Sequence, residues 1–228
     1  MSWALVPAAG SGRRFGGEVP KQYLQAAGKP LIGHALAALL AHPRIDGAVV
    51  ALAADDPRWP GWTMLHGKPV VTCVGGGERA DSVLAALRAL PEGVAEDELL
   101  LVHDAARPNL CADDIGRLID AATACADGAI LAAPVRDTLK RAGESGRIAA
   151  TEPRDGLWRA LTPQAFRRGL LRRALETAQA DGLVATDEAM AVERLGLCPA
   201  LVEGREDNLK VTTPADLALV DFLLSRNP

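Results

Sequence analysis

Residues 3–23 read WALVPAAGSGRRFGGEVPKQY, a short apolar run that passes into a glycine-rich turn with several basic side chains. The apolar run is typical of a buried strand. In the turn, backbone N–H groups can approach an anion closely, because glycine has no side chain and tolerates positive φ. Arg13, Arg14 and Lys21 would add cations beside those amides. The segment therefore predicts a strand followed by a phosphate-binding loop, and the expected guest is a polyanion such as a nucleoside triphosphate.

Two familiar phosphate-binding loops do not fit this segment. A P-loop places a lysine directly after its second glycine, but here Glu18 follows Gly17. A dinucleotide fingerprint requires glycine at the position of Phe15 and a carboxylate about twenty residues further on. Residues 28–41 contain no carboxylate. The remaining alternative is a Gly-Ser-Gly turn that merely ends a strand, and the neighbouring cations argue against it.

Apolar runs and helical patterns alternate along the chain. The runs are continuous, as in strands buried on both faces of a sheet, and they cover residues 4–8, 48–53, 69–74, 99–102, 129–133 and 199–202. The helical patterns cover residues 31–41, 80–90, 112–126, 165–180, 187–195 and 214–224, the last after Thr213 as N-cap. This alternation predicts an α/β fold with a Rossmann-like, mostly parallel sheet flanked by helices. Ligands bind at the carboxyl ends of such strands, so the loops after residues 8, 74, 102 and 133 should converge.

Residues 135–160, VRDTLKRAGESGRIAATEPRDGLWRA, break this alternation. Two short β-forming pieces flank the polar turn Gly143-Glu144-Ser145-Gly146, which predicts a β-hairpin. The hairpin has little apolar material to bury against its own core. It would be either a loose surface hairpin or an arm that packs on a second subunit, and we favour the arm, which predicts a homodimer. We expect one domain, residues 1–228, with this arm inserted.

The composition is that of a soluble protein with a sizeable core. Of the 228 residues, 49% are hydrophobic and 24% are charged, and the formal net charge is −4. This balance argues against broad binding to nucleic acid or to anionic membranes. No run approaches the ~20 apolar residues of a membrane span, and the first ten residues lack the basic region of a signal peptide. The four cysteines form no close CxxC pair, so we expect reduced thiols and a cytoplasmic protein.

A second candidate group, LVHDAARP at residues 101–108, lies where a predicted strand ends. Asp104 would point into the ligand crevice and could hold Mg²⁺, which prefers carboxylate and phosphate oxygens. Arg107 could bind a phosphate through two parallel hydrogen bonds. For His103 we favour a buried, hydrogen-bonded neighbour over a catalytic role. No serine or cysteine is coupled to it in a triad-like motif.

Two further loops follow predicted strands. In GGGERADSV, residues 75–83, the glycines would let the backbone run against a flat base, and Ser82 would hydrogen-bond that base. The alternative for this loop is a loose connection capped by Glu78. In EGREDNLKVT, residues 203–212, Asp207 and Lys210 bracket another strand end, although an ordinary charged surface loop has the same composition. Cations, a carboxylate and glycine turns thus recur at strand ends, an arrangement that favours substitution at phosphorus.

In their order along the chain, these blocks resemble the 2-C-methyl-D-erythritol 4-phosphate cytidylyltransferase family, CTP-using enzymes of the non-mevalonate isoprenoid pathway. The matching blocks are PAAGSGRRF, PKQY, GGGERADSV, LVHDAARP, APVRDTLKR, GLWRALTPQ, ATDEA and EGREDNLKVTTP, from about residue 5 to about residue 216. HDAARP together with PAAGxGxR is the specific part of the match. The resemblance implies a nucleotide-diphospho-sugar transferase-like fold. It also implies transfer of CMP from CTP to 2-C-methyl-D-erythritol 4-phosphate, with release of pyrophosphate.

The resemblance further assigns roles to individual residues. Arg14 and Lys21 would be the catalytic cations, and Mg²⁺ or another divalent cation would be held by Asp104 and Asp207. The nucleotide would be bound by Pro7, Ala8, Ala9, Gly10, Gly12, Gly76, Ser82 and Lys210. The sugar phosphate would be bound by Asp104, Arg107, Thr138, Arg154 and Thr186. Because family members are dimers whose arms reach across, Thr138 and Arg154 would serve the partner's site.

Three other functions share parts of this evidence. The first is a cytidylyltransferase for a different polyol phosphate, such as ribitol 5-phosphate. The second is a nucleotidyltransferase that uses another base. The third is a catalytically silent nucleotide-binding regulator, against which the cations at positions 13, 14 and 21 argue.

Overall fold

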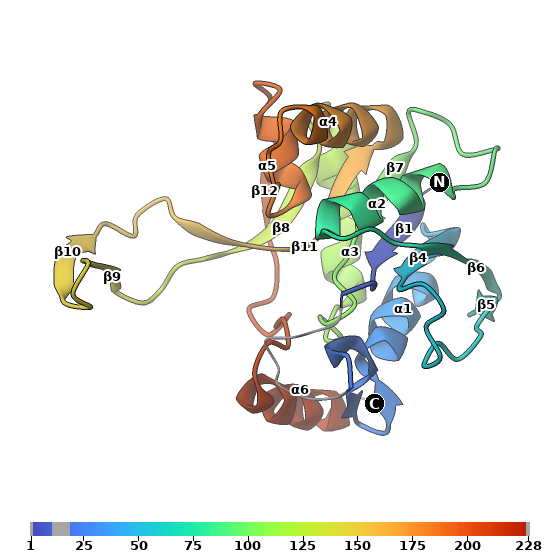
Figure 1. Cartoon of the computed structure of the whole chain (residues 1–228), viewed down its shortest axis with the longest axis horizontal. Helices are drawn as coiled ribbons and strands as arrows, with labels where there is room; N and C mark the ends of the chain where they lie inside the picture. Colours follow the sequence, from blue (N-terminus) through green and yellow to red (C-terminus); the bar gives the residue numbers. More distant parts are fainter. Residues whose placement is uncertain (1, 11–18, 227–228) are drawn as a thin grey trace.

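A central β-sheet organises the chain in the structure, a computed structural model that describes residues 2–10 and 19–226. The strands of this sheet are β1 (Ser2–Pro7), β4 (Gly47–Leu52), β5 (Met64–Leu65), β6 (Lys68–Val74), β7 (Leu99–Val102), β8 (Ala129–Pro134), β11 (Trp158–Arg167) and β12 (Ala200–Glu203). Their order across the sheet is β12-β8-β11-β7-β1-β4-β6-β5 (Figure 1). β1 runs parallel to both β4 and β7, and β12 runs parallel to β8. The predicted α/β fold with a mostly parallel sheet is confirmed.

Helices cover both faces of the sheet, because successive strand residues point to opposite faces. Leu5 packs in a cluster with α2 (Arg79–Arg88), α4 (Arg168–Ala180) and α5 (Glu188–Glu193). Its neighbour Val6 packs in a second cluster with α1 (Leu31–Ala41) and α3 (Ala112–Ala124). Both side chains are fully buried. The continuous apolar runs of the sequence therefore correspond to strands covered on both sides.

A smaller cluster packs α6 (Pro214–Arg226) against the short strand β2 (Gln25–Ala26), which pairs with β3 (Lys29–Pro30). Thr213 is confirmed as the N-cap of α6, since its hydroxyl oxygen accepts a 3.3 Å hydrogen bond from the backbone N–H of Asp216. Among the described residues, no helix has the length and apolarity needed to cross a bilayer.

One element was predicted wrongly. Residues 165–167 do not begin a helix but end β11, and α4 begins at Arg168. β11 lies between β7 and β8 and runs antiparallel to both, so it is an interior strand of the sheet. Its apolar residues Ala165 and Phe166 are fully buried there. The local sequence of residues 165–167 also suits a helix, but pairing of β11 with β7 on one edge and with β8 on the other makes these residues a strand.

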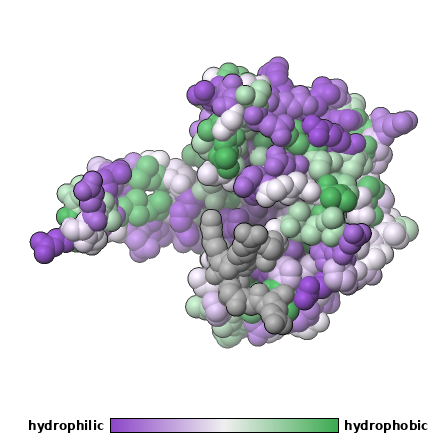
Figure 2. Space-filling model, in the orientation of Figure 1, coloured by the Kyte–Doolittle hydropathy of each residue, from purple (hydrophilic) through white to green (hydrophobic). Residues whose placement is uncertain are grey.

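The predicted hairpin is confirmed and projects from the body of the molecule (Figure 1). It consists of the antiparallel strands β9 (Leu139–Ala142) and β10 (Ile148–Glu152). The predicted arm, residues 135–160, extends too far by three residues, because Trp158 pairs with Pro134 at the start of β11. The arm is therefore residues 135–157. Figure 2 shows apolar side chains among hydrophilic ones along it, and Ile148 is 67% exposed.

Candidate functional site

A pocket opens where β1, β6 and β7 end, at the carboxyl edge of the sheet. The following residues, all predicted from the sequence as site residues, line it: Pro7, Ala8, Ala9, Gly10, Lys21, Gly76, Ser82, Asp104 and Lys210. The loop after residue 133 was also expected here, but among the described residues its members do not line the pocket. β8 instead leads into the arm, which leaves the same edge of the sheet as the other loops but does not line this pocket. Two predicted residues, Gly12 and Arg14, lie outside the described part of the chain.

The loop after β1 is held by a residue that the sequence analysis did not single out. The side-chain amide of Gln22 donates hydrogen bonds of 2.7 Å to the carbonyl of Ala8 and 3.2 Å to that of Gly10. Gln22 is buried and belongs to the single 3₁₀ turn η2 (Lys21–Tyr23), whose first residue, Lys21, lines the pocket. Gln22 thereby occupies two carbonyl oxygens that would otherwise repel an anion in the pocket.

The glycines of the loop after β6 permit a close approach between two chain segments. A Cβ atom on Gly75 would lie 2.6 Å from Cβ of Ala9, and one on Gly76 would lie 2.2 Å from Cβ of Asp81. The hydroxyl oxygen of Ser82 accepts a 3.2 Å hydrogen bond from the N–H of Gly76. Only glycine fits at the first two of these positions, and this close packing forms the wall of the pocket at the start of α2.

Glu78 is the N-cap of α2, as expected if this loop were only a connection between β6 and α2. Its side chain and that of Asp81 form a reciprocal capping box, in which Oδ2 of Asp81 accepts a 3.1 Å hydrogen bond from the N–H of Glu78. The connection is therefore ordered by its own capping residues while also lining the pocket. The loop can therefore be both a connection capped by Glu78 and a wall of the pocket.

Asp104 is surrounded by cations from three different segments. Its Oδ1 lies 3.0 Å from Nε of Arg79, and its Oδ2 lies 2.8 Å from Nζ of Lys210 and 3.4 Å from Nε of Arg107. Burial opposes ionisation of Asp104, but these three charges outweigh it and hold the pKa of the carboxyl well below its usual range. Arg79 is also paired with Glu188, so these three cations face two carboxylates, and one positive charge remains in excess at this end of the pocket.

His103 is confirmed as a buried neighbour of the site. Its Nε2 lies 2.9 Å from the carbonyl oxygen of Arg107, and the hydroxyl of Thr162 lies 3.0 Å from its Nδ1. Because a carbonyl only accepts, Nε2 carries the proton, and Nδ1 accepts from Thr162. Burial lowers the pKa of His103 to about 4. The imidazole is therefore neutral at pH 7 and holds the loop after β7 in place.

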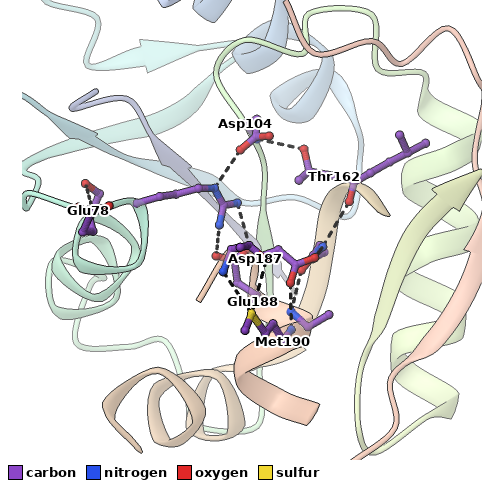
Figure 3. Close-up of polar contacts among 12 residues, drawn as sticks. Glu78, Asp104, Thr162, Asp187, Glu188 and Met190 are labelled. Carbon is purple, nitrogen blue, oxygen red and sulfur yellow. Dashed lines mark hydrogen bonds and ion pairs between the residues drawn. The ribbon is translucent and has the colours of Figure 1, made fainter. Parts of the chain in front are cut away.

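The most extensive polar contact in the pocket was missed by the sequence analysis. The guanidinium of Arg79 forks onto the carboxylate of Glu188 with N···O distances of 2.5 and 2.9 Å, while its Nε contacts Asp104 (Figure 3). Burial alone would lower the pKa of Arg79, but the two carboxylates raise it, so this residue is a fixed cation. The blocks GGGERADSV and ATDEA contain both partners, but nothing in the sequence pairs positions 109 residues apart.

The remaining predicted residues lie apart from the pocket within one chain. Arg107 is buried behind Asp104, where its Nη1 donates a 2.8 Å hydrogen bond to the carbonyl of Asn208. Thr138, Arg154 and Thr186 are exposed, and Arg154 contacts the backbone of Arg136 at the root of the arm. The sugar-phosphate group of the prediction is thus not assembled by a single chain.

The metal prediction meets a sparse donor set. Within the described part of the chain, no three His, Cys, Asp or Glu side chains are grouped so that they could hold a metal ion. Asp104 lines the pocket, whereas the carboxylate of Asp207 pairs with Arg205 and is not among the residues lining it. Mg²⁺ commonly binds one or two carboxylates together with substrate phosphates. Because both oxygens of Asp104 already contact cations, an ion held jointly by Asp104 and a bound triphosphate would have to displace one of them.

Comparisons with known proteins agree with one another. A family model described as IspD: 2-C-methyl-D-erythritol 4-phosphate cytidylyltransferase matches residues 2–226. A 2-C-methyl-D-erythritol 4-phosphate cytidylyltransferase of Xanthomonas campestris pv. campestris (strain 8004) is 66% identical over 98% of this chain and 84% of its own length. The protein of the same name from Stenotrophomonas maltophilia (strain R551-3) is 63% identical over 98% of this chain and 97% of its own length. A crystal structure of a 4-diphosphocytidyl-2C-methyl-D-erythritol synthase is similar, with a TM-score of 0.85 and 41% identity over 98% of both chains.

Proposed function

This chain belongs to the 2-C-methyl-D-erythritol 4-phosphate cytidylyltransferase family, and we propose that the pocket at the ends of β1, β6 and β7 is where it joins its two substrates. The enzyme transfers CMP from CTP to 2-C-methyl-D-erythritol 4-phosphate in isoprenoid precursor biosynthesis. The products are 4-diphosphocytidyl-2-C-methyl-D-erythritol and pyrophosphate. The observation that carries the proposal is the positive excess around Asp104 beside two glycine-rich loops.

The nucleotide end of the pocket combines backbone amides with cations. The triphosphate would lie along residues 7–10, whose loop Gln22 orders, and beside Lys21 and Lys210. The cytosine would lie against Gly76 and Ser82 at the start of α2, where Gly76 and Gly77 present no side chain to a flat ring. This arrangement uses every described residue that the sequence assigned to the nucleotide.

The chemistry requires charge neutralisation more than proton transfer. A phosphate oxygen of the acceptor attacks the α-phosphorus of CTP, and the bond from that phosphorus to the bridging oxygen of pyrophosphate breaks. A phosphate monoester is already an anion at neutral pH, so no general base is needed. The difficulty is that both reactants are polyanions. Lys21, Lys210 and Arg14 would reduce this repulsion and stabilise the charge that grows on the α-phosphoryl oxygens and on pyrophosphate.

The divalent cation is a proposal that rests on Asp104. When bound, Mg²⁺ would neutralise part of the triphosphate charge, held by Asp104 together with phosphate oxygens. Arg79 and Arg107 keep the Asp104 carboxylate ionised and fixed in place for that purpose. A role for Asp207 stays a prediction, since its carboxylate is engaged by Arg205.

The acceptor end is proposed to need a second copy of the chain. Thr138 and Arg154 are exposed on or beside the projecting arm, which also exposes Ile148 and, at its root, Trp158, 38% exposed. Apolar side chains displayed on an arm favour burial against another subunit. In a homodimer the arm would deliver Thr138 and Arg154 to the partner's pocket, beside Arg107 and Thr186.

A product assay tests the proposed function. The purified protein, Mg²⁺ and CTP are combined with 2-C-methyl-D-erythritol 4-phosphate, and pyrophosphate release and the diphosphocytidyl product are measured. The expected result is formation of both products, with lower rates when ribitol 5-phosphate replaces the acceptor or when UTP, ATP or GTP replaces CTP. Faster turnover with another alcohol phosphate or another nucleotide would contradict the proposal. Binding of CTP in a calorimeter without pyrophosphate release would instead indicate a silent regulator.

A further inference from the structure

We infer that the ion pair between Arg79 and Glu188 positions the acceptor-binding end of the pocket relative to the nucleotide-binding end. The inference rests on the proposed function, because it assigns Thr186 to the acceptor. Arg79 begins α2 and Glu188 begins α5, so the pair joins two helices that each follow a site loop. Both residues act through others and are therefore positioning residues.

Arg79 connects three segments through one planar group. Its Nε contacts Asp104 at the end of β7, and its Nη1 and Nη2 both contact the carboxylate of Glu188. Three N–H donors in a rigid fork fix the relative orientation of two carboxylates, which a lysine ammonium cannot do. Arg79 also lines the pocket itself, three residues before Ser82. Its position thus links the nucleotide wall, the Asp104 loop and α5.

Glu188 depends on Arg79. It is fully buried, and the hydrogen bonds found for its carboxylate in the described part of the chain all come from Arg79. A buried charge is stable only when it is paired and hydrogen-bonded. Loss of this pairing would favour movement of the start of α5 toward solvent.

The start of α5 is held from its other side by β11. The amide nitrogen of Gln164 donates a 2.9 Å hydrogen bond to Oδ2 of Asp187, and its amide oxygen accepts one of 2.9 Å from the N–H of Ala189. Oδ1 of Asp187 caps α5 by accepting a bond from the N–H of Met190 (Figure 3). Gln164 and Arg79 together therefore clamp residues 187–189 between β11 and α2.

Thr186 immediately precedes this clamp and has no comparable anchor of its own. It is exposed, and its hydroxyl contacts only the sulfur of Met190, at 3.5 Å, among its hydrogen bonds in the described part of the chain. Its place relative to the nucleotide is therefore set by residues 187 and 188. The ion pair with Arg79 then fixes the position of residues 187 and 188 relative to α2, the helix that contains Ser82.

The test is kinetic and uses the full chain. Glu188→Gln keeps the shape of the side chain and removes its charge. The expected result is that kcat/KM for 2-C-methyl-D-erythritol 4-phosphate falls about 10- to 100-fold, the range produced by small displacements of orienting groups, while the dissociation constant of CTP measured by calorimetry is unchanged. Glu96→Gln is the matched control, because it removes the exposed carboxylate that pairs with Arg172. It should change neither quantity.

Arg79→Lys gives a second, independent variant if Glu188→Gln fails to fold. It retains the positive charge beside Asp104 and Glu188 but lacks the fork. Because Arg79 also lines the pocket, the affinity for CTP should fall somewhat, and kcat/KM for the acceptor should fall more. A lowered melting temperature with unchanged kinetics for both substrates would mean that the pair is only structural and would overturn the inference. An equal loss for CTP and acceptor would overturn it as well. Absence of product with the wild-type protein would instead refute the proposed function.

Discussion

Nζ of Lys210 lies 2.8 Å from Oδ2 of Asp104, and this ion pair joins the loop after β12 to the loop after β7. Arg79 and Arg107 approach the same carboxylate from two further directions. Asp104 thus orients three positive charges, and because Glu188 also neutralises Arg79, one of the three remains in excess. A site with this excess can accept phosphate oxygens, because its cations are already in place before the anions arrive.

Removal of one pocket cation should slow turnover more than it weakens nucleotide binding. We expect Lys21→Ala and Arg14→Ala each to lower kcat by about 10²- to 10³-fold, because loss of one donor to developing charge has this effect in other enzymes. KM for CTP should change much less, since the loop amides remain. Steady-state kinetics with Arg44→Ala as a surface control, whose partner is Asp120, tests this. Unchanged kcat in either pocket variant would refute the electrostatic assignment.

The glycines after β6 should differ sharply in their tolerance of a methyl group. In Gly76→Ala the new Cβ would lie 2.2 Å from Cβ of Asp81, so we expect destabilisation by about 1–3 kcal/mol and a higher KM for CTP. In Gly77→Ala the Cβ meets no atom within 4 Å, and the free energy of unfolding should be unchanged. Denaturant unfolding of both variants measures this. Equal stability of the two would contradict the close packing of this loop.

His103 should make the protein lose stability in mild acid. Its pKa is about 4 in the folded state and about 6.5 in an unfolded chain, so only the unfolded state binds the proton between these values. The free energy of unfolding therefore falls as the pH drops from about 6.5 to about 4. His103 accounts for roughly 3 kcal/mol of this decrease. Asp104, whose pKa is lowered on folding, adds its own loss only below about pH 4.

Denaturant unfolding at about pH 7.5 and about pH 4.5 separates this contribution from the others. In His103→Gln the side chain does not titrate. The difference in unfolding free energy between the two pH values should therefore be smaller than in the wild-type protein, by the amount that protonation of His103 contributes. An unchanged difference would mean that the imidazole is not held neutral in the folded protein.

Mixed dimers test whether the arm serves the partner's pocket. Lys21→Ala and Arg154→Ala would each be weakly active alone, the second through a raised KM for the sugar phosphate with CTP spared. If arms cross, a mixed dimer has one pocket with both Lys21 and Arg154 intact, and activity should reappear on mixing and subunit exchange. If each arm serves its own chain, both pockets stay defective and no activity returns. Sedimentation of the wild-type protein checks that it is dimeric.

The sequence predicted the site loops well because each depends on local chemistry. Gly10, Gly76 and Asp104 lie directly after strands, and parallel strands bring their carboxyl ends to one edge. Spacing along the chain was therefore enough to place them in one pocket. The same holds for His103, whose burial follows from the apolar strand before it.

Two features could not be predicted, for different reasons. Pro163 argues against a central strand, yet β11 pairs on both edges, with a register shift toward β8 between Ala160 and Gln164. Tertiary pairing there overrides the local pattern. The Arg79–Glu188 pair joins two helix starts that only the folded sheet brings together. No periodicity in the sequence carries that information.

A crystal structure of the protein with CTP and Mg²⁺ would show where the nucleotide binds. We expect its triphosphate to lie against residues 8–10 with its oxygens contacting Lys21 and Lys210, and its base to lie against Gly76 and Ser82. A nucleotide whose phosphates lie outside this pocket, away from both lysines, would contradict the proposed site.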